Sequence, residues 1–150
     1  MIFSITKHTN LSQDKIFQIS TDIDNFHKVL PDYFKSLELL ETNNDEQIFL
    51  EKIVFLGIPL KIKTKHIVRT PDIHKIYILT GLTKGTEFIE RYDSLKDGTK
   101  ITIDVRLQLF IGLRFFRFIE KYLSSKMISI TEDFITAAEK FAANSTPKSC

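Results

Sequence analysis

The sequence predicts an α+β domain in which a curved antiparallel sheet of about seven strands wraps around one long C-terminal helix. Residues 111–143 contain no proline and repeat apolar side chains every three or four positions, the spacing of one helix face. Residues 36–109 instead show short alternating segments separated by turn residues, which is typical of strands. A sheet with one apolar face needs a covering layer, and the long helix is the element that can supply it.

The segment before the sheet predicts one strand and two short helices. Residues 2–7 alternate in polarity and form the first predicted strand. Asn10 or Ser12 caps a helix that reaches about residue 20, and Thr21 or Asp22 opens a second helix over residues 23–30. Pro31 ends the second helix, because the residue before a proline avoids the helical conformation.

Six further strands are predicted between the short helices and the long one. Their connections are short, which favours antiparallel pairing, since parallel pairs need long crossovers. Gly57 and Pro59 are expected to break one run, and Asp97–Gly98 is a strong hairpin signal. Residues 1–143 are predicted to form a single domain, and the polar residues 144–150 are expected to be disordered. The predicted strands cover residues 36–42, 46–55, 60–69, 73–81, 86–95 and 100–109.

Composition narrows the function classes. The chain has 21 basic and 19 acidic residues, a balance that argues against a dedicated nucleic-acid binder. Its single cysteine, Cys150, cannot form an internal disulfide, and the four histidines show no metal-ligand spacing. No metal or cofactor is therefore predicted. With neither a signal peptide pattern nor a run of apolar residues long enough to span a membrane, a cytoplasmic location is expected.

The order of elements resembles the START-like, Bet v 1-like helix-grip superfamily (SRPBCC), in particular its polyketide cyclase/dehydrase and lipid-transport branch. The resemblance is carried by residues 11–17, by the Asp22–Pro31 segment and by the C-terminal helix. The chain lacks the proline that often opens the first helix and the tryptophans often found in the second. The resemblance implies an internal apolar cavity for a lipid-like, polyketide-like or quinone-like molecule, and it implies no catalytic residue.

His66 is the first candidate for chemistry. Alternation places it on the apolar face of its strand together with Thr64. It could orient a ligand hydroxyl or act as an acid or base near neutral pH. The alternative is a core histidine whose hydrogen bonds are satisfied within the protein.

Glu90 and Tyr92 form a second candidate pair. If Asp97 and Gly98 are the central turn residues, Tyr92 lies opposite Ile103 and Glu90 opposite Val105, so that both side chains point inward. An inward carboxylate in an apolar pocket would have a raised pKa and could serve as a general acid or base. A change of one residue in the loop would instead turn Glu90 to solvent.

Three functions remain open at this stage. The first is binding or transport of a hydrophobic small molecule, the second an enzyme of the cyclase/dehydratase type that uses an inward His or Glu. The third is a protein-interaction module with a filled core. Aromatic and basic residues at 113–119 could also touch a membrane transiently, or simply pack with their arginines reaching water. The oligomeric state is not predicted. The predicted ligand-binding positions are Phe26, Leu60, Ile62, Thr64, His66, Ile78, Phe88, Glu90, Tyr92, Ile103, Leu107, Phe116, Leu123, Met127 and Ile130.

Overall fold

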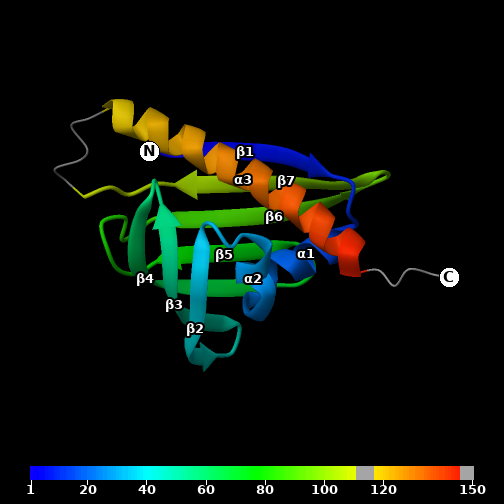
Figure 1. Ribbon diagram of the computed structural model, residues 1–150, viewed down its shortest axis with the longest axis horizontal. Helices are drawn as coiled ribbons and strands as arrows, with labels where there is room; N and C mark the ends of the chain where they lie inside the picture. Colours follow the sequence, from blue (N-terminus) through cyan, green and yellow to red (C-terminus); the bar gives the residue numbers. More distant parts are fainter. Residues whose placement is uncertain (111–116, 146–150) are drawn as a thin grey trace.

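The computed structural model describes residues 1–110 and 117–145 (Figure 1). Strand β1 (Ile2–Thr9) is followed by two short helices, α1 (Gln13–Thr21) and α2 (Ile23–Val29), then by six strands and the long helix α3 (Arg117–Ser145). The six strands are β2 (Phe34–Asn43), β3 (Glu46–Phe55), β4 (Ile58–Arg69), β5 (Ile73–Ile78), β6 (Glu87–Leu95) and β7 (Gly98–Arg106).

The strands form one antiparallel sheet in the order β1-β7-β6-β5-β4-β3-β2. Strands β2 through β7 pair in sequence through connections of two or three residues, apart from residues 79–86 between β5 and β6, and β1 pairs with β7 at the opposite edge of the sheet. The predicted fold class is therefore confirmed: seven curved antiparallel strands, two short helices after the first strand and a long C-terminal helix across the concave face (Figure 1).

Local capping explains where the short helices begin. Ser12 is the N-cap of α1 and its side chain accepts a hydrogen bond from the backbone N–H of Lys15. Asp22 is the N-cap of α2, although its carboxylate accepts from the Asn25 amide rather than from a backbone N–H. Glycine is required at one turn in particular, because Gly98 has φ +143° and a Cβ there would lie 2.0 Å from the Thr9 carbonyl oxygen.

Helix α3 approaches β1, α1 and α2 most closely. Its C-terminal half packs through Ile135, Ala138 and Ala142 against α1, α2 and the paired strands β6 and β7. Farther toward its start, Leu123 joins Val105 and Leu107 in a second apolar cluster, with Met127 and Phe88 beside it. Half-buried Ile103 contacts both clusters, so the two cores meet at the middle of β7.

The β6–β7 hairpin corrects the predicted register. Leu95 pairs with Gly98, so the central turn residues are Lys96 and Asp97, one position earlier than expected. Tyr92 consequently lies opposite Ile101 and Glu90 opposite Ile103, not Ile103 and Val105. Moving the turn by one residue moves the pairing by two, and an even shift leaves every side chain on the same face of the sheet.

Several predicted boundaries also differ. Strands β5 and β7 end at Ile78 and Arg106, each three residues before the predicted end. Pro59 lies inside β4, paired with Val54, and does not break the strand. It is tolerated because β5 pairs with β4 only from Thr64 onward, so no neighbour needs the missing N–H. Helix α3 continues to Ser145, two residues into the predicted tail. The predicted start of this helix at 111–116, the candidate Phe116 and the tail residues 146–150 lie outside the described residues.

Candidate functional site

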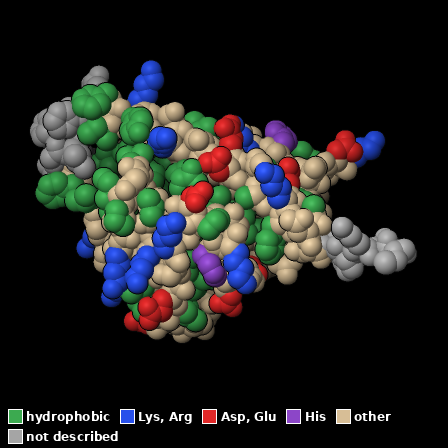
Figure 2. Space-filling model, viewed as in Figure 1, with side chains coloured by type: hydrophobic (Ala, Val, Ile, Leu, Met, Phe, Trp, Pro, Cys, Tyr) green, Lys and Arg blue, Asp and Glu red, His purple; other side chains and the backbone are tan. Residues whose placement is uncertain are grey.

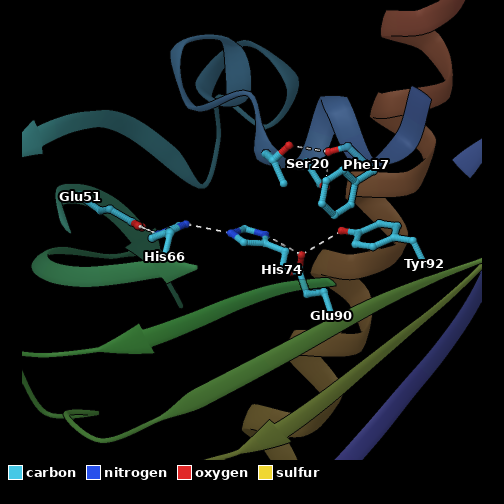
Figure 3. Close-up of polar contacts among 8 residues, drawn as sticks. Phe17, Ser20, Glu51, His66, His74, Glu90 and Tyr92 are labelled. Carbon is cyan, nitrogen blue, oxygen red and sulfur yellow. Dashed lines mark hydrogen bonds and ion pairs between the residues drawn. The ribbon is translucent and has the colours of Figure 1, made fainter. Parts of the chain in front are cut away.

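Four neighbouring strands bring acidic, imidazole and phenol side chains together on the concave face of the sheet. Glu51 lies on β3, His66 on β4, His74 on β5, and Glu90 and Tyr92 on β6 (Figure 3). Alternation explains this placement, because each of these residues shares the inward face of its strand with buried or half-buried apolar or aromatic residues. Phe49 and Ile62 are two such neighbours, 2% and 7% exposed.

The side chains form a continuous hydrogen-bonded chain. Glu51 Oε1 is 2.9 Å from His66 Nε2, His66 Nδ1 is 3.0 Å from His74 Nε2, and His74 Nδ1 is 2.9 Å from Glu90 Oε2. The Tyr92 hydroxyl donates to Glu90 Oε2 at 2.8 Å. We call these five residues the buried polar chain.

Thr64 completes the end of the buried polar chain at Glu51. Its hydroxyl donates to Glu51 Oε1 and also lies 3.0 Å from His66 Nε2. Phe49 stands edge-on to the His66 ring, with centroids 5.0 Å apart. Glu51, Thr64 and His66 are 2–4% exposed, so their polar atoms are satisfied by one another and not by bulk water.

At the other end, α1 covers Tyr92. The Tyr92 ring meets Phe17 edge-to-face at 5.3 Å, and the side-chain amide of Gln13 donates to the Tyr92 carbonyl oxygen at 2.6 Å. Burial and the neighbouring negative charge of Glu90 raise the pKa of Tyr92 well above its ordinary value, against a lowering by the Ser20 hydroxyl. Tyr92 is therefore a neutral hydrogen-bond donor at physiological pH.

Glu90 contradicts the expectation of a raised pKa. Burial raises it, but the charge of His74 and the hydrogen bonds from His74 and Tyr92 outweigh burial, and the pKa of Glu90 is lowered. Of the two predicted orientations, inward or solvent-facing, the contacts with His74 and Tyr92 show the inward one. Glu90 is thus an ionised acceptor held by donors, and a poor general acid.

His74 and Glu51 were not among the predicted site residues. His74 carried a usable signal, because it shares its strand face with Ile76 and Ile78. Glu51 lies in a strand with apolar residues on both faces, so alternation alone did not assign its direction. Nothing in the sequence showed that the two histidines on neighbouring strands would meet.

The predicted ligand-binding residues that the structure describes fall into two groups. Ile62, Thr64, His66, Tyr92, Leu107 and Leu123 are buried. Half-buried positions are Phe26, Leu60, Ile78, Phe88, Glu90, Ile103, Met127 and Ile130. Phe26 packs against Phe34 and Phe134 rather than against the buried polar chain. Whether any of them contacts a ligand stays a prediction.

A groove opens between α3 and the β3–β4 end of the sheet. Its volume is about 220 Å³. One wall of the groove is formed by α3. The opposite wall is formed by the α2–β2 loop, the end of β3 and the turn that follows β3. The lining residues are Asp32, Tyr33, Val54, Leu56, Gly57, Tyr122, Lys126 and Ile130. A smaller hollow of about 80 Å³ lies between α1, α2 and Phe141.

Apolar side chains also gather on the surface near the start of α3 (Figure 2). Phe118, Phe110 and Leu82 are 63–70% exposed, and the Phe110 N–H donates to the Leu82 carbonyl oxygen. Among the described helices, none combines the length and apolar character needed to cross a membrane. The described residues likewise contain no cluster of three potential metal ligands.

Comparison with solved structures identifies the fold. The protein TTHA0849 of Thermus thermophilus superposes with a TM-score of 0.79 at 14% identity, over 97% of this chain and 100% of that one. The chain has the Bet v 1-like helix-grip fold. Norcoclaurine synthase of Thalictrum flavum, solved with dopamine and hydroxybenzaldehyde, gives a TM-score of 0.73 at 16% identity, over 99% and 89% of the two chains.

Other helix-grip structures include the di-domain ARO/CYC StfQ of the steffimycin biosynthetic pathway. It matches with a TM-score of 0.80 at 13% identity, over 95% of this chain and 51% of StfQ. No protein-family model matches the sequence, and no curated protein does so either. At these identities the comparisons establish the fold, and the function has to be argued from the site.

Proposed function

We propose that the protein binds a small, mainly apolar molecule between the concave face of the sheet and α3, and that the groove beside α3 admits it. The observation that carries this proposal is incomplete packing at the centre of the concave face. Phe88 and Ile103 lie on central strands and share that face with buried neighbours, yet both are only half-buried. Side chains at such positions are fully buried when helix and sheet close completely.

The groove has the character of a ligand passage. Ile130 lines it, and Met127 lies one turn earlier on α3, where it packs with the apolar cluster around Leu123. The wall combines apolar side chains, such as Val54 and Leu56, with polar ones, such as Asp32, Tyr33 and Lys126. Small-molecule sites combine these two features, since apolar area supplies affinity and a few polar atoms supply orientation.

A fluorescent-probe titration with a blocking variant tests the proposal. N-phenyl-1-naphthylamine is neutral and brightens in apolar surroundings, so its emission reports occupancy. Met127→Trp adds a bulky ring where α3 faces the sheet and should weaken probe binding at least about tenfold, the cost of overfilling a packed site. Ile128→Trp is the matched control, because the neighbouring position is 37% exposed and points about 100° away around the helix.

The probe titration distinguishes a site between sheet and helix from the absence of a site. Tight probe binding that Met127→Trp removes and Ile128→Trp retains supports a site between sheet and helix. Absence of binding by the wild-type protein, together with a mass free of any co-purified small molecule in native mass spectrometry, overturns the proposal. In that case the interaction-module hypothesis becomes the better one.

A second candidate function is acid–base catalysis of the cyclase/dehydratase type. The buried polar chain favours it, because two imidazoles and two carboxylates in direct contact can hold and move protons. Its test is solvent deuterium incorporation into a bound aromatic ketone, compared between the wild type and His74→Gln. Incorporation that is equal in the two proteins and in buffer would exclude this function for that substrate.

A further inference from the structure

Most polar atoms of the predicted site are already occupied by one another. The hydroxyls of Thr64 and Tyr92 donate to Glu51 and Glu90, and both ring nitrogens of His66 have partners within 3.0 Å. These groups have little capacity left for a ligand. Two carboxylate oxygens differ, Oε2 of Glu51 and Oε1 of Glu90, because no described residue donates to either, and the Glu90 side chain is the more exposed of the two.

Both hydrogen bonds to Glu90 reach Oε2. His74 Nδ1 and the Tyr92 hydroxyl lie 2.9 and 2.8 Å from that oxygen, and no described residue donates to Oε1. Oε1 is not sealed in the core either, because no fully enclosed side-chain oxygen or nitrogen of the described residues lacks a partner. The Glu90 side chain is 17% exposed, compared with 6% for Glu51 at the opposite end.

The number of hydrogens needed by the contacts of the buried polar chain determines the net charge of its carboxylates and imidazoles. Three contacts join Glu51, His66, His74 and Glu90, and each contact needs one hydrogen. Two neutral imidazoles beside two carboxylates supply only two. One additional proton is therefore required to make all three bonds, and the four groups together then carry a net charge of −1.

The contacts also locate the additional proton. The single hydroxyl hydrogen of Thr64 goes to Glu51, so its contact with His66 Nε2 requires that Nε2 carries hydrogen. Glu90 is ionised, so His74 Nδ1 donates to it. The remaining hydrogen lies between His66 Nδ1 and His74 Nε2, and the two rings share one positive charge.

We propose that Glu90 Oε1 is the polar anchor of the ligand site, and that the bound molecule presents a hydrogen-bond donor, such as a hydroxyl, to it. The protonated His66–His74 pair keeps Glu90 ionised, and Tyr92 fixes its orientation from the other side. A ligand that offered only acceptor atoms would meet an unpaired anionic oxygen and would be rejected. This inference rests on the proposed binding function and specifies the chemistry of its ligand.

The groups that face Glu90 come from three elements. His74 approaches from β5 and Tyr92 from β6 itself, while Ser20 of α1 lies beyond the Tyr92 hydroxyl. His66 and Glu51 act from β4 and β3 through His74. The anchor therefore depends on a charge arrangement that spans four strands and would not survive the loss of either imidazole.

Nuclear magnetic resonance of the ligand-free protein tests the charge arrangement. Proton-detected ¹⁵N spectra of the imidazoles at pH 7 should show three N–H hydrogens shared by His66 and His74, where two neutral rings would show two. Glu90→Gln removes the anion that accepts from His74 Nδ1, so the third hydrogen should be missing from the spectrum of this variant. Two neutral rings in the wild type, unchanged by Glu90→Gln, would overturn the inference.

A pair of ligands that differ by one hydrogen-bond donor tests the anchor. Competition of 2-naphthol and 2-methoxynaphthalene against the fluorescent probe compares a donor with its methyl ether. The wild type should prefer 2-naphthol by about tenfold or more, the value of one hydrogen bond to a charged acceptor. Glu90→Gln should abolish the preference, and Glu87→Gln, the same change on the outer face of β6, should preserve it.

Failure of the proposed binding function and failure of the Glu90 anchor give different results in these experiments. If neither naphthalene nor the probe binds, and native mass spectrometry finds no co-purified molecule, the proposed binding function is wrong, whatever the imidazole spectra show. If both naphthalenes bind equally well to the wild type, the cavity exists and the anchor is refuted. A preference that persists in Glu90→Gln would likewise assign the donor to another acceptor.

Discussion

Removing the Tyr92 hydroxyl isolates one bond of the buried polar chain. Tyr92 is 1% exposed, its ring is held by Phe17, and its hydroxyl donates to Glu90 at 2.8 Å. Tyr92→Phe keeps the ring and its packing while Glu90 loses a donor. A hydrogen bond to a charged acceptor is worth about 1.5–3 kcal/mol, and water reaching the partly exposed Glu90 recovers some of it. We expect a loss of about 1–2 kcal/mol in the free energy of unfolding.

Urea denaturation followed by far-ultraviolet circular dichroism measures this change, which corresponds to a decrease of about 2–8 °C in Tm for a chain of this size. The pH dependence supplies a second signature. The pKa of Tyr92 is raised in the folded protein, so its contribution to stability is present below the unfolded value of about 10 and is lost as pH rises toward the folded value. Tyr92→Phe should lack that alkaline loss.

Tyr122→Phe is the control, because Tyr122 is 52% exposed and its variant should change the free energy of unfolding by less than about 0.5 kcal/mol. A Tyr92→Phe protein as stable as the wild type, with the same decline above about pH 10, would refute the reasoning. It would mean that the hydroxyl is not a donor to an ionised Glu90.

Two further predictions concern stability. The pKa of Glu90 is lowered in the folded protein, so its contribution to the free energy of unfolding is present above the unfolded pKa of about 4.5 and is lost as pH falls through the folded pKa. Glu90→Gln should therefore flatten the decline in stability measured by urea denaturation between about pH 6 and 3. An unchanged decline in the variant would contradict this prediction. Gly98→Ala should destabilise far more than Gly57→Ala, because its Cβ would lie 2.0 Å from the Thr9 carbonyl oxygen, whereas a Cβ at Gly57 has no atom within 4 Å. Thermal unfolding compares the two, and equal losses would show that strain at positive φ, and not the collision, decides both.

The sequence was sufficient for the fold class because its signals are local and mutually consistent. Alternation in β4 separated Ile62, Thr64 and His66 from the lysines of the outer face, and helical spacing defined the stripe of α3. The sequence predicts the turn between β6 and β7 one residue later than the structure has it. The inward orientation of Glu90 and Tyr92 survived that error because side-chain direction depends only on whether the register shift is odd or even.

Other features of the site depend on distances between strands, which no local pattern encodes. The sequence determined that His66 and Glu90 belong to strands with one apolar face, but pairing of β4 with β5 and of β5 with β6 brought His74 between them. That position reversed the expected pKa shift of Glu90, since burial alone raises a carboxyl pKa and an adjacent imidazole charge lowers it. Sequence thus specifies which face a side chain occupies, and only the assembled sheet specifies which charges become its neighbours.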